Sequence, residues 1–589
     1  MSRAVPCRAR RSTSCTGARR PRPPLHSRPR LVNRSSRAEL RRAALVGLAA
    51  VVVVASGAVA GVRLAPLFDP ANHAAVRGFA RGLWPPDVSL EFLRVVAAAT
   101  LRTAAIAIAG TALSLIVALP LAFLATATLF RRGPLVEGER RAPSGMVLAA
   151  ASVAARAALG FLRAVPDLVW ALLFVAGFGL GAVPGVLALA VSYGGMLGRI
   201  LADLFETVDP RPLEALRSTG ATRAQILVFG IWPQARTSAI AYVLYSFECC
   251  VRSAMVLGLV GAGGLGYEIS QIATLIAALL AMVWLTDATS LALRRLLRAN
   301  APPGWYVQRR LRTDVPAAPR GAIAAGLAAI VIAAGAAIGL FDRGVLDPAA
   351  LGHMARLVRD LFPPDLAPDH LRTLIEPVAQ TLGTSVIGTL LGVAIGAALG
   401  VPAAAPHDED DRARGAAHLV RHAVRRLSRA TLSLLRAIPD VLWVLIFLLA
   451  VGLGPFAGTL ALGVHTGGVL GKLYADTLEE VSPLPLRGLR ATGATPLQIL
   501  VWGAWPEARR MLVSYTLLRW EMNLRTSTVL GIAGGGGLGI ALYNDVQLRF
   551  YPQAATMILV VYGLVTATGW LGDAVLRRLE SASLATARR

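Results

Sequence analysis

Residues 161–167 read Phe161-Leu162-Arg163-Ala164-Val165-Pro166-Asp167, and 273 positions later the chain repeats Leu435-Arg436-Ala437-Ile438-Pro439-Asp440. The same offset joins three more pairs of stretches: Gly194-Gly195 and Gly467-Gly468, Thr219-Gly220-Ala221-Thr222 and Thr492-Gly493-Ala494-Thr495, and the glycine-rich runs 261–266 and 534–539. Nearer the start of each copy, Leu83-Trp84-Pro85-Pro86-Asp87 matches Leu361-Phe362-Pro363-Pro364-Asp365 at an offset of 278, so the five-residue difference falls in a loop. The chain is therefore predicted to be a tandem duplication.

Composition places both copies in a membrane. The chain has 589 residues, of which 55% are hydrophobic and only 16% charged, and its mean hydropathy is +0.58. Uncharged runs at 43–62, 321–340 and 555–572 have roughly the 20 residues that a helix needs to cross a bilayer. Further spans are expected at about 95–126, 166–181, 183–201, 236–260 and 270–292, with counterparts in the second copy. Residues 149–162, which carry Arg156, fit either a span or an interfacial helix.

The predicted fold class is all-α: a polytopic membrane protein with two tandem transmembrane domains of about six helices each. The expected boundaries are a disordered basic tail at 1–42, a first domain at 43–293, a cytoplasmic linker at 294–320, a second domain at 321–579 and a short tail at 580–589. The tail has no pattern of a cleaved secretory signal. An RNA-binding tail is the alternative to a topology signal, but we expect no nucleic-acid partner.

Charge placement predicts the orientation in the membrane. The net charge is +26, and residues 1–42 hold thirteen arginines against one acidic residue, Glu39. Other arginine clusters fall on every second loop between spans, whereas the intervening loops 63–92 and 341–372 mix both signs. By the positive-inside rule, both termini and the polar loops 206–233 and 479–506 are expected in the cytoplasm of a bacterial cell, with the chain in its inner membrane. An even number of crossings per copy makes the copies parallel repeats, with a substrate path on the axis between them.

Sequence motifs give no sign of an enzyme. Gly261-x-Gly263-x-x-Gly266 has the dinucleotide-binding spacing but lies between membrane-length helices and recurs at 534–539, which favours a tight glycine turn. The single lysine, Lys472, is followed by leucine, so the chain has no phosphate-binding P-loop. Cys7, Cys15, Cys249 and Cys250 form neither a metal-ligand spacing nor a disulfide pattern. We therefore expect no catalytic residues, no metal and no cofactor.

The polar loop of each copy has a recognisable pattern. Glu214-Ala215-Leu216-x-x-x-Gly220-Ala221, continuing to Ile231-Trp232-Pro233, resembles the "EAA" loop of ABC importer permeases, which docks on the ATPase subunit. The second loop has Arg487-Gly488-Leu489 in place of Glu214-Ala215-Leu216 but keeps Gly493, Ala494, Trp505 and Pro506. The resemblance implies that the coupling residues are Glu214, Ala215, Gly220, Ala221, Pro233, Gly493, Ala494 and Pro506. The alternative is an ordinary cytoplasmic helix-loop-helix.

Within this class the chain resembles the phosphonate importer permease, on three stretches. They are Arg163-Ala164-x-Pro166-Asp167-x-x-Trp170, Arg436-Ala437-x-Pro439-Asp440-x-x-Trp443, and Glu521-Met522-Asn523-x-Arg525-x-Ser527-x-Val529-Leu530-Gly531. The resemblance implies two fused domains of a type I ABC importer that moves a phosphonate or related oxyanion inward. It also implies two cytoplasmic ATPase subunits and an extracytoplasmic binding protein as partners. The rival function is an ion-gradient-driven secondary transporter, in which duplicated helical halves also occur.

Charged residues inside spans are the candidates for the substrate path, because a charge at the bilayer centre is costly without a partner or a wet cavity. The candidates are Glu248, Arg252, Glu521, Asn523 and Arg525. Glu248 and Arg252, like Glu521 and Arg525, are four residues apart on one helix face, so a self-neutralising ion pair is the simpler interpretation. The other is that Arg252 and Arg525 hold or pass an anion. Arg163 with Asp167, and Arg436 with Asp440, are expected to serve snorkelling and capping at the start of a span.

Overall fold

The computed structural model describes residues 32–63, 65–82, 88–130, 143–258, 320–342, 347–404 and 416–587, together with isolated positions between 274 and 292. Within these ranges every regular element is helical. The chain forms two units, Met1–Val52 and Val53–Arg589. The described part of the first unit is the start of helix α1 (Val32–Val59), and everything below concerns the second unit.

The first copy holds the elements η1 (Ala65–Phe68), α2 (Pro70–Gly82), α3 (Leu90–Ala125), α4 (Ala127–Phe130), α5 (Pro143–Ala164), α6 (Asp167–Phe178), α7 (Ala182–Glu206), α8 (Pro210–Ser218), α9 (Arg223–Gln225), the π-helical turn η2 (Ile226–Ile231) and α10 (Trp232–Leu257). The second holds α12 (Arg320–Ala337), α13 (Pro348–Asp360), α14 (Pro368–Thr373), α15 (Ile375–Ala403), α16 (Ala416–Ala437), α17 (Asp440–Val451), α18 (Pro455–Glu480), α19 (Pro483–Ala491), α20 (Pro496–Gln498), the π-helical turns η6 (Ile499–Ala504) and η7 (Gly531–Gly535), α21 (Trp505–Leu530), α22 (Leu538–Gln547) and α23 (Tyr551–Ala587).

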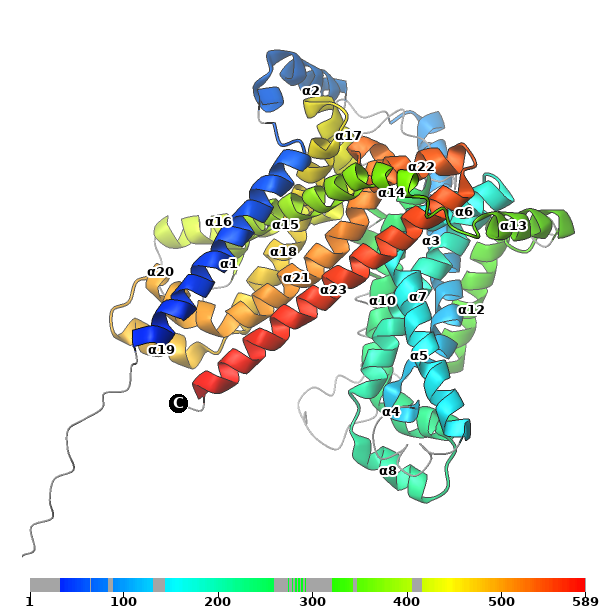
Figure 1. Ribbon diagram of the computed structural model, residues 1–589, viewed down its shortest axis with the longest axis horizontal. Helices are drawn as coiled ribbons and strands as arrows, with labels where there is room; N and C mark the ends of the chain where they lie inside the picture. The colour runs from blue at the N-terminus through cyan, green and yellow to red at the C-terminus, as the bar shows by residue number, and fades with distance from the viewer. Residues whose placement is uncertain are drawn as a thin grey trace, which may run out of the picture. The chain divides into compact units, whose positions relative to one another are not determined.

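The sequence repeat is also a repeat of helix packing. In the first copy α3, α5, α6 and α10 all pack against α7. In the second copy their counterparts α15, α16, α17 and α21 pack in the same way against α18 (Figure 1). Each copy is therefore a bundle organised around one central helix, and the duplication inferred from the sequence is confirmed.

Small residues set the closest of these helix contacts. On α15, Gly388, Gly392, Gly396 and Gly400 recur every fourth residue and face α18. A Cβ atom on Gly400 would lie 2.6 Å from the backbone oxygen of Gly471. Such a spacing of glycines lets two helix backbones approach closely, which is how helices pack within a membrane.

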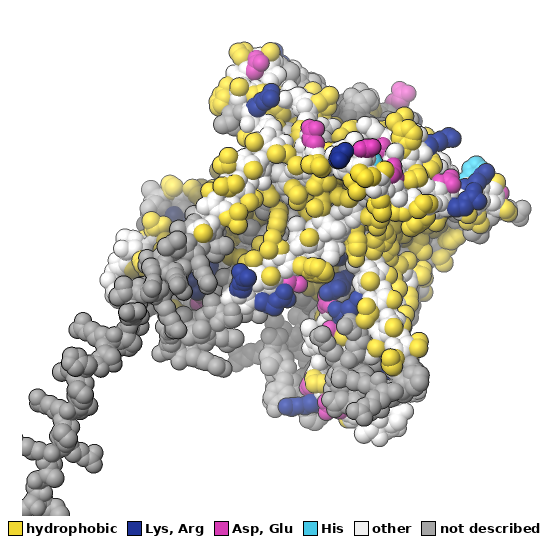
Figure 2. All heavy atoms as spheres, viewed as in Figure 1, with side chains coloured by type: hydrophobic (Ala, Val, Ile, Leu, Met, Phe, Trp, Pro, Cys, Tyr) yellow, Lys and Arg dark blue, Asp and Glu magenta, His cyan; other side chains and the backbone are white. Residues whose placement is uncertain are grey.

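Length and composition make six helices of the described chain able to cross a membrane, or up to eight if each of two bent pairs counts as one span. The six are Leu90–Ala125, Gly145–Ala164, Ala182–Glu206, Arg223–Leu257, Pro368–Ala403 and Tyr551–Arg578. Hydrophobic side chains cover much of the visible face of these helices, with charged side chains mostly toward the helix ends (Figure 2). The chain is thus a multi-pass membrane protein. Most of the expected span at 270–292 lies outside the described residues.

One expected span is wrong. Residues 166–181 contain a helix of only 12 residues, α6, which covers about 18 Å and is too short to cross the bilayer. The break at Pro166 separates it from α5, and Gly179 and Gly181, both at positive φ, end it. Its counterpart α17 is bent by 92° from α16. The long helix of this pair is α5, which includes residues 149–162.

The second glycine-rich run is a turn, as predicted. Gly534, Gly536 and Gly537 have positive φ, a conformation open to glycine, and the chain bends by 64° between α21 and α22. Gln380 and Thr381 of α15 fix the turn, because their side chains accept the backbone N–H groups of Gly537 and Leu538, each at 2.9 Å. The first run, 261–266, lies outside the described residues.

Candidate functional site: two loops and an arginine cluster

The loop after α7 forms a helix, a glycine break and a second helix. Asp209 caps α8, and Gly220, at φ +81°, ends it. Thr222 and Gln225 then form a capping box that starts the next helix. Leu213 of α8 is buried against Gly230, where a Cβ atom would lie 2.7 Å from its side chain, so the two helices form one rigid unit.

The second loop has the same construction. Gly493 has φ +84°, Thr495 and Gln498 form the capping box, and Leu486 packs on Gly503. Among the predicted coupling residues the exposed ones are Glu214, Ala215, Gly220, Pro233, Gly493 and Pro506, and the half-buried ones are Ala221 and Ala494. Both loops therefore present the same backbone shape although Arg487 replaces Glu214.

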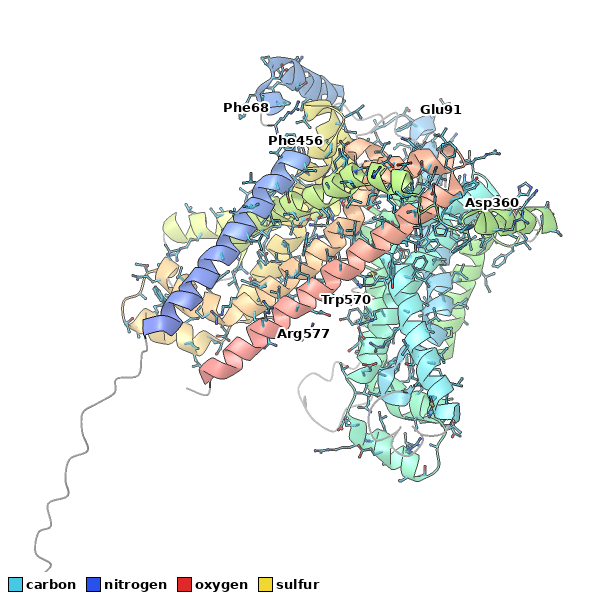
Figure 3. All side chains as sticks on the ribbon, in the orientation of Figure 1. Phe68, Glu91, Asp360, Phe456, Trp570 and Arg577 are labelled. Atoms are coloured by element: carbon cyan, nitrogen blue, oxygen red, sulfur yellow. The ribbon has the colours of Figure 1, made fainter. Side chains whose placement is uncertain are left out.

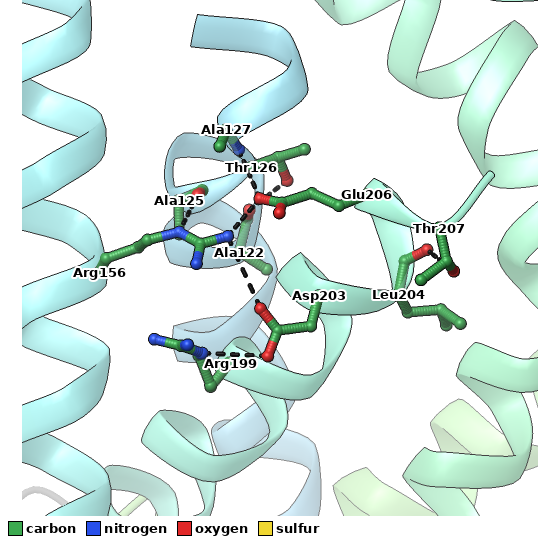
Figure 4. Close-up of polar contacts among 10 residues, drawn as sticks. All are labelled: Ala122, Ala125, Thr126, Ala127, Arg156, Arg199, Asp203, Leu204, Glu206 and Thr207. Atoms are coloured by element: carbon green, nitrogen blue, oxygen red, sulfur yellow. Dashed lines mark hydrogen bonds and ion pairs between the residues drawn. The ribbon is translucent and has the colours of Figure 1, made fainter. Parts of the chain in front are cut away.

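A polar latch joins each loop to its bundle. Arg156 of α5 pairs with Glu206, the last residue of α7, and donates through Nε to the carbonyl of Ala125 at 2.8 Å (Figure 4). Glu206 also accepts the backbone N–H of Ala127, and Arg156 lies 3.6 Å from Asp203. Arg156 of α5 thus joins the end of α3 to the end of α7, directly before α8.

The latch recurs in the second copy. Arg429 of α16 pairs with Glu479, near the end of α18, and donates to the carbonyl of Ala403 at 2.9 Å. Arg425 adds a second contact to Glu479 at 3.5 Å. Because both copies keep the arginine, the glutamate and the carbonyl, the latch belongs to the repeated architecture.

The two halves meet at an ion pair that no local sequence rule predicts. Arg163, at the end of α5, forms a 2.8 Å ion pair with Glu521 of α21. Arg525, one turn further along α21, donates to the carbonyl of Arg163 at 2.8 Å. Glu521 therefore pairs with a residue of the other half. Arg163, which was predicted to cap or snorkel at the start of a span, forms this ion pair between the halves.

In the first half the predicted local pair does form. Arg252 Nη2 lies 2.9 Å from Glu248 Oε1, and both side chains are largely buried. The Sγ of Cys249 lies 3.8 Å from the same Arg252 nitrogen. Arg252 and Arg525, the two arginines predicted on the path, thus come from corresponding helices of the two halves and have different partners.

Arg519 adds a third arginine to this region, and the sequence analysis missed it. Its charge interacts with Asp440 of α17 and with Arg252 of the first half. Its Nε atom is buried and has no hydrogen-bond partner among the described residues. Since Ser246 occupies the corresponding position in the first copy, the repeat gave no signal for Arg519.

His465 of α18 faces the same arginines. It interacts with Arg519, Arg252 and Arg436, and its Nδ1 atom lies 3.1 Å from the carbonyl of Ile438. Arginines from α10, α16 and α21 therefore converge on one region between the halves, which we call the arginine cluster: Arg252, Arg436 and Arg519, with the imidazole of His465 beside them. The guanidinium groups of these three arginines can donate to an anion, and the acidic residues Glu248 and Asp440 lie beside Arg252 and Arg519.

Asn523, also predicted on the path, has a different environment. It is fully buried, and its amide accepts from Thr466 at 3.0 Å and donates to Thr389 at 2.8 Å. Its hydrogen bonds thus join α21 to α15 and α18, whereas Glu521 and Arg525 on the same helix contact the other half.

The chain is similar to known transport proteins. Residues 143–338 and 415–581 each match the family described as binding-protein-dependent transport system inner membrane component. The phosphate-import permease protein PhnE of Mycolicibacterium smegmatis is 31% identical over 80% of this chain and 84% of its own length. The phosphite transport system permease protein PtxC of Stutzerimonas stutzeri is 33% identical over 39% of this chain and 78% of its own.

Among solved structures, a chain of the inward-facing MetNI methionine ABC transporter aligns with a TM-score of 0.33 at 21% identity, covering 36% of this chain and 99% of that one. The family model matches the chain twice, and the two matches together cover more than half of it. The chain belongs to the family of binding-protein-dependent transport system inner membrane components, as a multi-pass transport subunit that carries the family's domain twice.

Proposed function

We propose that this chain is the permease of an ABC importer that moves phosphonate, or a related small oxyanion such as phosphate or phosphite, into the cell. ATP is hydrolysed by a separate subunit. The names of the relatives, phosphate-import and phosphite transport permeases, support this substrate class. All of these anions offer several oxygens to guanidinium donors.

The observation that carries the proposal is the arginine cluster between the halves. Arg252 comes from the first half and Arg519 from the second, and Arg519 has a buried Nε without a hydrogen-bond partner in the described chain. Guanidinium groups stay charged and present several N–H donors, so they match a tetrahedral oxyanion. Arg252 and Arg525 would pass the anion along the interface between the two bundles.

The motor would act through the two loops. One ATPase subunit docks on α8 and its glycine break, and a second on α19 and its glycine break, which gives two copies per transporter. The latches at Arg156 and Arg429 connect these loops to three helices of each bundle and support a rigid transfer of motion. In this orientation both loops and both termini lie in the cytoplasm, and a binding protein delivers the anion outside.

An apolar layer lies directly beside the cluster. Leu168 and Val441, corresponding residues next to Asp167 and Asp440, are 2% and 1% exposed and belong to one hydrophobic core. Such a layer bars a hydrated anion until the bundles move apart. Alternating access would open this layer on one side and the space between the loops on the other.

The experiment compares the two candidate energy sources in proteoliposomes that contain the chain, its ATPase subunit and its binding protein. Uptake of radiolabelled methylphosphonate or phosphate should require the ATPase subunit and ATP, and should continue in the presence of an ionophore. Uptake without the ATPase subunit that an ionophore abolishes would establish the secondary transporter instead.

A further inference from the structure

A cavity of about 1380 Å³ lies between the two halves, at the end of the bundles opposite the loops. Leu180, just before α7, lines it, whereas α8 follows the other end of α7, which is 25 residues or about 37 Å long. α6 supplies one wall, α13 another, and α22 with the start of α23 the third. Its lining therefore comes from both copies.

The floor of this cavity is the apolar layer described above. Leu168 and Val441 both line it, together with Ile532 of the glycine-turn region. The residues that precede them in the chain, Asp167 and Asp440, lie on the side of the arginine cluster, since Asp440 interacts with Arg519 and with Asp167. The apolar layer therefore adjoins both the cavity and the cluster. The cavity therefore lies at the outer entrance of the proposed path.

The charged residues of the cavity wall are mostly cationic. Arg356 on α13 and Arg549 after α22 line it, against one carboxylate, Asp360 (labelled in Figure 3), and the imidazole of His353 lies on the same wall. Arg356 has a long contact to the carbonyl of Gly352, at 3.4 Å. In the described part of the chain neither Arg356 nor Arg549 forms an ion pair within 4.0 Å, whereas Asp360 lies 3.9 Å from Arg359, which is outside the lining.

Arg549 is also unusual in its backbone. Its φ is +62°, and it is the one non-glycine residue at positive φ among those described. Its backbone N–H donates to the backbone carbonyl of Val546, and the N–H of Phe550 donates to the backbone carbonyl of Asp545. This pattern ends a helix with a left-handed residue, which is usually glycine. An arginine in a conformation that favours glycine is a reason to look for a function at this position.

We propose that Arg356 and Arg549, with His353, form an outer binding subsite for a tetrahedral oxyanion such as phosphate or methylphosphonate. The subsite holds the anion above the closed Leu168–Val441 layer before it reaches the arginine cluster. Tyr543 and Gln547 line the same wall and offer neutral donors. The inference rests on the proposed function for its ligand class, but its test requires no transport.

The test measures charge and occupancy inside the cavity with a reporter cysteine. Cys7, Cys15, Cys249 and Cys250 are replaced by alanine, Ala176→Cys is introduced on the α6 wall of the cavity, and the full chain is placed in nanodiscs. An anionic and a cationic methanethiosulfonate reagent of equal length then compete for Cys at this position. We expect Arg356→Gln with Arg549→Gln to lower the anionic-to-cationic rate ratio by about threefold or more, from the loss of two nearby charges. The Lys double variant should keep the ratio.

Arg359→Gln is the matched control, because Arg359 is on the same helix with a 78% exposed side chain but does not line the cavity. It should leave the ratio unchanged. Phosphate and methylphosphonate should slow labelling in the parent more than chloride at equal ionic strength, and should lose this effect in the Gln double variant. An unchanged ratio, or protection by phosphate no better than by chloride, would overturn the subsite. If the intact wild-type transporter takes up neither phosphate nor methylphosphonate, the proposed function is wrong, but this result does not bear on the charge measured in the cavity.

Discussion

Arg163 of the first half and Glu521 of the second form an ion pair at 2.8 Å, although 358 positions separate them in the chain. The pair joins α5 to α21 next to the arginine cluster. We predict that Glu521→Arg alone reduces uptake strongly, because Arg163 then faces another cation. The exchange Arg163→Glu with Glu521→Arg should restore a substantial part of the uptake, measured in proteoliposomes. Equal loss in the single and exchanged variants would show that the pair does not act as a unit.

We predict that loss of the latch at Arg156 uncouples ATP hydrolysis from transport. Arg156→Ala leaves Glu206 without its arginine partner and should lower the free energy of unfolding by about 1–3 kcal/mol. It should also lower the amount of substrate moved per ATP hydrolysed, while the ATPase subunit still binds. Arg199→Ala is the matched control, because Arg199 forms only a surface pair with Asp203 and should cost about 0.5 kcal/mol or less. Thermal unfolding and paired ATPase and uptake assays measure both effects.

The corresponding change in the second copy, Arg429→Ala, should have the same direction of effect, since Arg429 makes the matching contacts. A variant that binds the ATPase subunit and transports with unchanged stoichiometry would contradict the role of the latches.

We predict that the glycine breaks of the two loops are needed for binding of the ATPase subunit. Gly220→Ala and Gly493→Ala place a side chain at φ +81° and +84°, which costs about 1 kcal/mol or more. Each should weaken binding of the ATPase subunit, measured by co-purification. Gly160→Ala is a suitable control, because Gly160 lies within α5, outside both loops, with open space around it, and there alanine favours the helix. Weakened binding in the control to the same degree would mean that the breaks have no special part in docking.

The features that depend on residues close together in the chain were predictable from the sequence. The repeat and the hydropathy predicted two helical bundles, and the EAA-like pattern with its glycine predicted two similar loops. The Glu248–Arg252 pair followed from a four-residue spacing on one helix. These features depend on neighbours along the chain, so the sequence displays them directly.

The contacts between distant segments were not predictable in this way. Arg156 was open to an interfacial interpretation because its partner Glu206 is 50 residues away. Glu521 was expected to pair with Arg525, and its partner is Arg163. Arg519 has no charged counterpart in the first copy, where Ser246 stands, so comparing the copies concealed it. Only the packing of the two bundles brings these groups together.

The central claim is that an anion passes between the halves along arginines while a separate motor supplies the energy. Uptake of radiolabelled methylphosphonate and ATP hydrolysis, measured together on the complete transporter with Arg252→Gln and Arg525→Gln combined, test it most directly. The account predicts that ATPase binding and hydrolysis persist while uptake is lost. Uptake at the wild-type rate in this variant would contradict it.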